Sequence, residues 1–390
     1  MTKRYRLAIY LQLHTGFALG LLRGLAQFAR RHPNIDLLKF AKPASYQPFE
    51  LRALKLNGII AKVSSREDEA VLGQLGIPVV NISGQILTPS LPTLNTDDRR
   101  VGELAFGHFF RRGYRAVAYC GPRDHRASLL RRKGLAEAAL AHDCRCDYYA
   151  LKPEEENFVM PGQLRRTLAT WLKTLPTGVG VLCFTDRVAL AVAEAAEVAR
   201  RRVPADIAIL GVGNDLTRLD FAHTEISSIE LPSPQIGLAA AELLLDLIRR
   251  RRKAATETLF QPPKIVTRRS TDHFAVADGT VALALDYIRE HRSNTIYVDA
   301  IARAAGVSRR ALEQRFRAAL GLSIYSVVQR VHLERAQELM ADPELSLAEI
   351  SYASGYENQR HLNVAFRRLL QTTPGQYRAS LGTDKAGKRR

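Results

Sequence analysis

Between residues 7 and 266, short apolar runs alternate with longer amphipathic stretches. The apolar runs are rich in β-branched residues and mostly bounded by Gly or Pro, which is typical of buried strands. We therefore predict strands over Leu7–Leu13, Asn57–Val63, Pro78–Ile82, Ala116–Cys120, Val179–Phe184 and Ile207–Val212. The amphipathic stretches predict helices over Phe17–Arg30, Val101–Arg112, Leu129–His142, Leu164–Leu175, Val188–Arg201 and Ser233–Arg252.

This alternation predicts an α/β fold. Strands that are apolar throughout are typical of a parallel sheet covered by helices on both faces, and the length of this region suits two such lobes. Ligands of these folds bind beyond the carboxyl ends of the strands. We therefore expect a two-lobed parallel-sheet effector domain with its ligand cleft between the lobes.

After residue 266 the chain shows only helical periodicity, and one helical pattern occurs twice there. In the second copy, a helix beginning near Leu347 is broken at Gly355, and another runs from about Asn358 to Leu370. The second helix has its apolar positions at i, i+3, i+4 and i+7, which predicts one buried face of Leu362, Ala365, Phe366 and Leu369. Thr373-Pro374-Gly375 ends this helix.

The first copy spans Val298–Phe316, and its Gly306 precedes Gly355 by 49 residues. A predicted helix from Tyr325 to Met340 separates the copies. Its apolar residues are expected to pack on both copies: Val328, Val331, Ala336 and Leu339. A helix, a glycine turn and a helix with a basic outer face form the arrangement that docks in a DNA major groove. The sequence therefore predicts an all-α domain with two helix-turn-helix elements.

The segment from about Thr280 to Arg378 resembles the DNA-binding domain of the AraC family of transcription regulators. The resemblance is carried by Ile350, Gly355, Tyr356, Leu362, Phe366, Pro374, Tyr377 and Arg378. Three positions depart from the family pattern: Leu362 replaces an aromatic residue, Gln371 replaces Gly, and His332 replaces a basic residue of the linking helix. None of these changes alters the helix-turn-helix pattern.

The polar faces of the two predicted recognition helices supply candidate DNA contacts. Arg can bind guanine and Gln or Asn can bind adenine through paired hydrogen bonds, and Glu can accept from cytosine. For base edges we predict Arg309, Arg310, Glu313 and Gln314 in the first element, and Gln359, Arg360 and Asn363 in the second. Arg317, Arg367 and Arg368 are predicted phosphate contacts. A solvated helix face is the alternative for any of these arginines.

The region before these helices resembles the effector domain of the LacI and galactose repressor family, which shares its fold with type I periplasmic sugar-binding proteins. The resemblance rests on Asn95–Asp98, Arg112–Ala118, Arg131 with Gly134, Phe184–Leu190 and Asp206–Asp215. Joined to an AraC-type domain, it gives the layout of the xylose-operon activator family. The junction from Pro262 to Asp272 is also similar to that family.

This resemblance implies that charged and amide side chains hydrogen-bond the hydroxyls of a sugar. The candidate ligand residues are His14, Thr15, Asp97, Arg131, Asp186, Asn214 and Asp215. Gly213 stands where relatives have Asp, so either the register shifts or the effector differs. Structural roles compete: Asp97 and Asp186 suit helix caps, and Arg131 belongs to a basic run that suits the surface.

Charge supports a polyanionic partner only in part. The net charge is +18, of which residues 281–390 carry +6 and the first 280 residues +12. The positive charge of the first 280 residues can serve solubility, or it can make additional contacts with DNA, and the sequence favours neither explanation. The patterns together predict an effector domain at 1–266, a linker at 267–279, an AraC-type DNA-binding domain at 280–380 and a basic tail at 381–390.

Other classes of protein find little support. No run of about 18 apolar residues predicts a membrane span. The basic and then apolar N-terminus resembles an export signal, but Gln12 and His14 interrupt it. The four cysteines lack metal-ligand spacing, and phosphate-loop, dinucleotide, zinc-protease and nucleophile-elbow motifs are missing. We therefore expect no metal, no cofactor and no enzyme activity.

The prediction is a cytoplasmic, sugar-responsive transcription factor, with activation favoured over repression. Its expected partners are double-stranded DNA, a sugar such as xylose, a second copy of the chain and, for an activator, RNA polymerase. Two alternatives stay open: a constitutive DNA-binding protein with a vestigial cleft, and a cytosolic sugar-binding protein.

Overall fold

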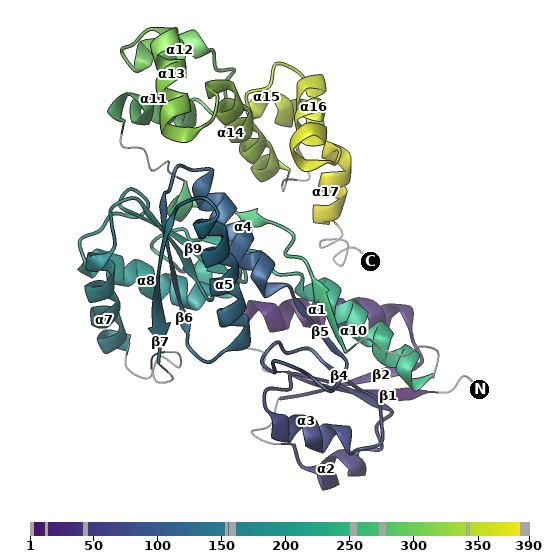
Figure 1. The fold of residues 1–390 in the computed structure, drawn as a ribbon. Coiled ribbons are helices and arrows are strands. Elements are labelled where there is room, and N and C mark those ends of the chain that lie inside the picture. The colour runs from purple at the N-terminus through teal and green to yellow at the C-terminus, as the bar shows by residue number, and fades with distance from the viewer. Residues whose placement is uncertain are drawn as a thin grey trace. The chain divides into compact units, whose positions relative to one another are not determined.

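A computed structural model of the protein describes residues 4–11, 15–41, 46–152, 155, 161–249, 256–272, 278–340, 342 and 344–382. The chain forms two compact units, Met1–His273 and Phe274–Arg390, called here the N-terminal and C-terminal units. Each unit is described by itself (Figure 1). Within the described ranges, no helix has the length and apolar character needed to cross a membrane.

The first lobe of the N-terminal unit is a parallel sheet between two pairs of helices. Its strands, in spatial order, are β11 (Glu257–Phe260), β5 (Thr93–Thr96), β4 (Val79–Asn81), β3 (Gly58–Ala61), β1 (Tyr5–Tyr10) and β2 (Ile35–Phe40). Helices α1 (Gly16–Arg31) and α10 (Ser233–Ile248) share one apolar core with the sheet. Helices α2 (Pro48–Ala53) and α3 (Arg66–Gly73) share a second core on the other face.

The second lobe repeats this architecture. Its strands, in spatial order, are β12 (Ile265–Val266), β10 (Ser227–Ile229), β9 (Ile207–Val212), β8 (Val179–Cys183), β6 (Ala116–Pro122) and β7 (Arg145–Leu151). Only the short β12 is antiparallel to its neighbour among the described strands of this sheet. The surrounding helices are α4 (Asp98–Phe110), α5 (Arg126–Leu140), α7 (Pro161–Thr174), α8 (Asp186–Val198) and the short α9 (Leu216–Leu219). The predicted two-lobed α/β fold is confirmed.

The strand predictions succeeded at the centre of each sheet and missed the rest. The strands β3, β8 and β9 are buried at every residue and read as continuous apolar runs. The edge strands β2 and β7 are partly exposed, so their sequences are mixed, and β5, β10, β11 and β12 are short or polar. Helices α4, α5 and α8 begin two to three residues before the prediction because their first turns are polar.

The chain passes between the two sheets at neighbouring places. It leaves the first lobe between β5 and α4, returns into α10 after β10, and leaves again between β11 and β12. The first and last of these crossings are bonded to each other. The Asp97 amide donates to the Phe260 carbonyl at 2.8 Å, and Gln261 Nε2 donates to Asp97 Oδ2 at 3.0 Å. These crossings fix the carboxyl ends of both sheets near one another.

Residues that the sequence assigned to the linker pack into the second lobe instead. The side chains of Ser270 and Thr271, in a short 3-10 turn (Arg269–Thr271), are fully buried. Ser270 Oγ donates to the Ile209 carbonyl at 2.6 Å, and Thr271 Oγ1 donates to Ser227 Oγ at 2.7 Å. Residues 268–271 therefore belong physically to the effector unit.

The C-terminal unit contains seven helices among its described residues: α11 (Gly279–Glu290), α12 (Val298–Ala304), α13 (Arg309–Leu320), α14 (Ile324–Leu339), α15 (Leu347–Ala353), α16 (Gln359–Leu370) and α17 (Pro374–Gly382). They enclose two apolar cores, and α14 contributes to both. Val328 and Val331 pack in the first core, whereas Ala336 and Leu339 pack in the second. The predicted role of the linking helix is confirmed.

The glycine turn of the second element depends on both conformation and space. Gly355 has φ +82°, and a Cβ there would lie 2.5 Å from His332 Nε2 and 2.6 Å from the Asn294 carbonyl oxygen. One buried-face prediction was wrong: Leu369 is 46% exposed, because the second core is already closed by Leu362, Ala365 and Phe366. Helix α16 ends at a left-handed Gln371, and Pro374 begins α17.

Candidate nucleic-acid interface and effector site

Each candidate recognition helix begins at a side-chain cap. Ser308 Oγ accepts a hydrogen bond from the Ala311 amide at 3.3 Å, and Asn358 Oδ1 accepts one from the His361 amide at 3.1 Å. Caps of this kind satisfy amide groups that the first turn of a helix leaves free. Helices α13 and α16 therefore start at defined residues and present fixed first turns.

The predicted DNA contacts lie on the sides of α13 and α16 that the cores leave open. Arg309, Arg310, Glu313, Gln314, Gln359 and Arg360 are exposed, and Asn363 is half-buried. The predicted phosphate contacts Arg317, Arg367 and Arg368 are also exposed and lie in the last turns. Two separate polar and basic faces result, and their individual contacts with DNA stay predictions.

Two of the predicted base contacts bind each other. Arg309 Nε donates to Glu313 Oε1 at 3.0 Å, and Arg309 Nη1 lies 3.7 Å from Asp299 Oδ1. These side chains are about half exposed, and such pairs contribute little because water and salt screen them. A guanine or phosphate can therefore compete for Arg309 at small cost.

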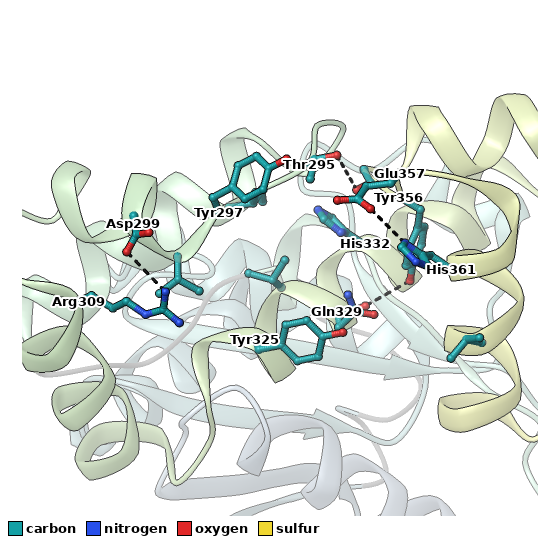
Figure 2. A pocket seen from close by; sticks show the side chains of 15 residues that line it. Thr295, Tyr297, Asp299, Arg309, Tyr325, Gln329, His332, Tyr356, Glu357 and His361 are labelled. Atoms are coloured by element: carbon teal, nitrogen blue, oxygen red, sulfur yellow. Dashed lines mark hydrogen bonds and ion pairs between the residues drawn. The ribbon is translucent and has the colours of Figure 1, made fainter.

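The two helix-turn-helix elements enclose a groove of about 410 Å³, called here the central groove (Figure 2). The first residue of α13, the first half of α14 and the first two turns of α16 line it, together with the loop before α12, the start of α12 and the turn after α15. At one end Arg309 lies 3.7 Å from Asp299, and at the other His361 Nδ1 lies 3.6 Å from Glu357 Oε2. Sequence reasoning did not identify this groove, because it forms only when distant segments meet.

In the N-terminal unit, Arg131 is buried and fully engaged. Its Nε and Nη2 both lie 2.7 Å from Asp98 Oδ1, and Nη1 donates to the Phe184 carbonyl at 2.6 Å. Its guanidinium also lies over the Phe184 ring at 5.0 Å. The alternative of a surface position for Arg131 is therefore wrong. The residue holds α4, α5 and the end of β8 together.

Asp186 is also buried, and its carboxylate joins two strand ends. Oδ2 accepts from the Asp215 amide at 2.7 Å, and Oδ1 accepts from Ser228 Oγ at 2.5 Å. Burial raises the pKa of Asp186, and these two hydrogen bonds oppose that rise. Its carboxylate thus holds the loop after β9 against β10 at the carboxyl end of the second sheet.

Asp215 links the two lobes directly. Its Oδ2 accepts from the Gly16 amide at 3.0 Å, and its Oδ1 accepts from Thr217 Oγ1 at 2.6 Å. Gly16 begins α1, whose N-cap is Thr15. A carboxylate at a helix N-terminus is electrostatically favourable. The structure therefore brings the predicted residues Thr15, Asp186 and Asp215 into one cluster.

The glycine that departs from the family pattern has a structural reason. Gly213 has φ +123°, and a Cβ would lie 3.3 Å from Asp186 Oδ2. An aspartate there would be strained and would bring a second carboxylate toward Asp186. The next residue, Asn214, uses its side-chain oxygen to accept from Arg268 Nη2 at 2.8 Å. Arg268 was missed as a site residue, although it lies in the junction motif.

The remaining predicted ligand residues, Asp97 and His14, are not placed in this cluster. Asp97 caps α4 through the Arg100 amide at 3.1 Å, as its structural alternative proposed. His14 lies outside the described residues. In the described part of the chain, no three His, Cys, Asp or Glu side chains gather as a metal site.

Three buried polar atoms lie at or near the carboxyl ends of β4 and β5. Asn95 Nδ2, Thr96 Oγ1 and Gln85 Oε1 are shielded from water and have no hydrogen-bond partner among the described residues. Buried polar groups normally have partners, so such atoms suit a bound hydroxyl compound. The Asn95–Asp98 motif located two of them, but only the fold shows that their polar atoms are unpaired.

Comparisons with known proteins match both units. Residues 106–271 match the family of periplasmic binding protein-like domains, and residues 301–380 match a helix-turn-helix domain family. A solved transcriptional regulator in complex with cellobiose is 19% identical, with a TM-score of 0.57 over 69% of this chain and 86% of its own. That likeness supports the fold of the N-terminal unit.

Other similarities span nearly the whole chain. The xylose operon regulatory protein of Escherichia coli (strain K12) is 26% identical over 97% of both chains, and that of Haemophilus influenzae is 24% identical over 97% of this chain and 99% of its own. A solved xylose-binding transcription activator is 25% identical with a TM-score of 0.63, covering 97% of this chain and 99% of that one. This chain therefore joins a periplasmic-binding-protein-like domain to an AraC-type helix-turn-helix domain, and it is homologous to the xylose operon regulatory proteins.

Proposed function

We propose that this protein is a cytoplasmic, sugar-responsive transcription regulator that binds double-stranded DNA with both helix-turn-helix elements. The observation that carries the proposal is the shared helix α14, which packs in the cores of both elements and leaves two exposed recognition helices on one scaffold. Retrieval of genomic fragments tests DNA binding. No enrichment of any sequence by the full chain, with or without sugar, contradicts it.

The effector is a small polyhydroxylated compound, with xylose as the first candidate. Its support is the cluster of strand-end polar residues, the unpaired atoms of Asn95 and Thr96, and homology to xylose operon regulators. A ligand that binds only the folded state raises the melting temperature. A thermal-shift panel of aldoses, ketoses and sugar acids, followed by calorimetry, should show a shift. A panel without shift or heat contradicts the effector proposal.

The combination of readouts separates the alternatives. A sugar-responsive regulator changes its DNA enrichment when sugar is added. A constitutive DNA-binding protein with a vestigial cleft enriches the same fragments either way and shows no thermal shift. A sugar-binding protein alone shows the shift and enriches nothing.

We also propose that the protein acts as a homodimer and that, as an activator, it contacts RNA polymerase. Closed two-fold pairing is the commonest assembly of soluble homo-oligomers, and paired protomers suit repeated operator half-sites. Light scattering at micromolar concentration, with and without DNA and sugar, tests the dimer. A strict monomer under every condition contradicts it. Transcription in vitro with purified polymerase tests activation.

A further inference from the structure

The central groove lies between the two recognition helices and shares residues with both. Arg309, at the start of α13, lines one end, and His361 and Val364 of α16 line the other. These helices are the surfaces expected to enter two successive major grooves. Whatever lies between those grooves on the same face of the duplex must pass over the central groove.

The middle of the central groove offers neutral hydrogen-bond donors. Tyr297 and Tyr325 are 64% and 58% exposed, and Gln329 is half-buried beside Tyr325. Neither phenol hydroxyl has a hydrogen-bond partner among the described residues. Figure 2 shows these three side chains between the Asp299–Arg309 pair at one end and the Glu357–His361 pair at the other.

The floor of the groove is tied together by its own hydrogen bonds. The Tyr356 hydroxyl donates to the Gln329 carbonyl at 3.5 Å, and Thr295 Oγ1 donates to the Gly355 carbonyl at 3.4 Å. The ring of His332 packs edge-on against Tyr356, with 5.6 Å between centroids. Both rings are buried, whereas the side chains of Tyr297 and Tyr325 are exposed.

We propose that the central groove is a binding site for the sugar–phosphate backbone that separates the two major-groove segments, with Tyr297, Tyr325 and Gln329 donating to its phosphates. Tyr and Gln are ordinary phosphate ligands, and such contacts set register without reading sequence. The occupant follows from continuity with the recognition helices, because any DNA that meets both must cross this surface. This inference rests on the proposed DNA-binding function and deepens it.

The acidic residues define where the backbone lies. Asp299 and Glu357 repel phosphate, and only Asp299 has a permanent cation beside it, Arg309 at 3.7 Å, whereas Glu357 has the His361 ring at 3.6 Å. Phosphates are therefore disfavoured beside Glu357 and accepted at the neutral centre, while Arg309 stays available to DNA at the other end. The site also differs from an ordinary basic patch, because its native contacts carry no charge and leave the salt dependence of binding nearly unchanged.

A gain-of-function variant gives the first test. Gln329→Lys places a cation at the centre of the groove and should strengthen binding to a random-sequence duplex of about 40 base pairs. The plot of log affinity against log salt should steepen by about 0.9, as one added phosphate contact requires. Gln329→Glu should weaken binding at least tenfold. The proposal is overturned if both variants bind this duplex as the wild type does.

Removal of the hydroxyls gives the second test. The double variant Tyr297→Phe/Tyr325→Phe keeps both rings and all charges, and it should bind every duplex about tenfold more weakly with an unchanged salt slope. Tyr148→Phe, at an exposed tyrosine of the N-terminal unit, is the matched control. Phosphate ethylation at the centre of the footprint should block the wild type but not the double variant. Insensitive central phosphates overturn the inference, whereas a wild type that binds no DNA overturns the proposed function itself.

Discussion

Asp186 Oδ2 lies 2.7 Å from the amide nitrogen of Asp215, which donates to it, although the residues are 29 apart in sequence. This bond ties the start of α8 to the loop after β9. Asp215 in turn accepts from Gly16 of the other lobe at 3.0 Å. One buried carboxylate therefore positions the residue through which the two lobes touch.

Replacement of Asp186 by Ala should destabilise the N-terminal unit. It leaves the Asp215 amide and Ser228 hydroxyl buried without an acceptor, which costs about 2–4 kcal/mol in the free energy of unfolding. Asp186→Asn keeps one acceptor and should lose less. Urea unfolding measures both, with the exposed Asp36→Ala as control. An Asp186→Ala variant as stable as the wild type would mean that the carboxylate is not needed for packing.

Arg131 should be more sensitive than its basic neighbours. Arg131→Met leaves Asp98 buried and without its cation, and breaking a buried pair in this way costs about 3–5 kcal/mol. Adding Asp98→Asn should restore part of the loss, since it removes the unpaired charge. Lys133→Met, at an exposed neighbour, should change stability by less than about 0.5 kcal/mol. A double-mutant cycle by urea unfolding measures the coupling, and additive losses would disprove it.

These pairs show where sequence reasoning stopped. The central strands and both recognition helices follow from local periodicity, since burial on both faces or on one face leaves a direct mark in the sequence. The partners of Arg131 and Asp186 do not, because Asp98 is 33 residues from Arg131 and Ser228 is 42 residues from Asp186, and each pair meets only when the second lobe folds. The family resemblance selected suitable residue types, but it could not tell a ligand contact from a structural bond.

The departure at His332 predicts a dependence of stability on pH. His332 is 3% exposed, and burial lowers its pKa from 6.5 to about 4, against a small opposing effect of the Asn294 carbonyl. Between these values the unfolded chain binds a proton that the folded chain does not. Stability is therefore complete above about pH 6.5 and falls as pH drops toward about 4, by roughly 1–3 kcal/mol.

The variant His332→Gln isolates this effect, because Gln does not titrate. Urea midpoints of the C-terminal unit's transition at about pH 7.5 and pH 5 should converge in the variant and differ in the wild type. His125, whose pKa is also lowered to about 4, lies in the other unit and serves as a comparison. Equal pH dependence in wild type and His332→Gln would assign the effect to other groups.

Two arginines of α16 should separate sequence reading from affinity. Arg360 lies in the first turn and Arg367 in the last, and both are exposed. Arg360→Ala should cost about 1–3 kcal/mol on the cognate site and relax preference at one base position. Arg367→Ala should weaken all duplexes alike and lower the salt slope by about one. Binding isotherms on a library of single-base variants measure both, and a reversed pattern would exchange the two roles.

The length and packing of α14 predict that DNA binding depends on the spacing between the two half-elements of the operator. The helix has 16 residues, so at 1.5 Å per residue it is about 24 Å long. Its two halves are fixed in different cores, so it holds α13 and α16 at one separation. That scale is near one helical turn of DNA, about 34 Å, and slight bending of the duplex can supply the remainder.

An insertion of five base pairs between the half-elements rotates the second by about half a turn to the opposite face of the duplex. Affinity should therefore fall to that of a single element, whereas an insertion of about ten base pairs restores the face but not the distance and should recover little. Isotherms and footprints on native and inserted operators measure this. An Arg360→Ala variant should lose affinity on the native operator but almost none on the inserted one if only α13 still binds there. Undiminished binding to the inserted operator would show that α14 does not couple the two elements rigidly.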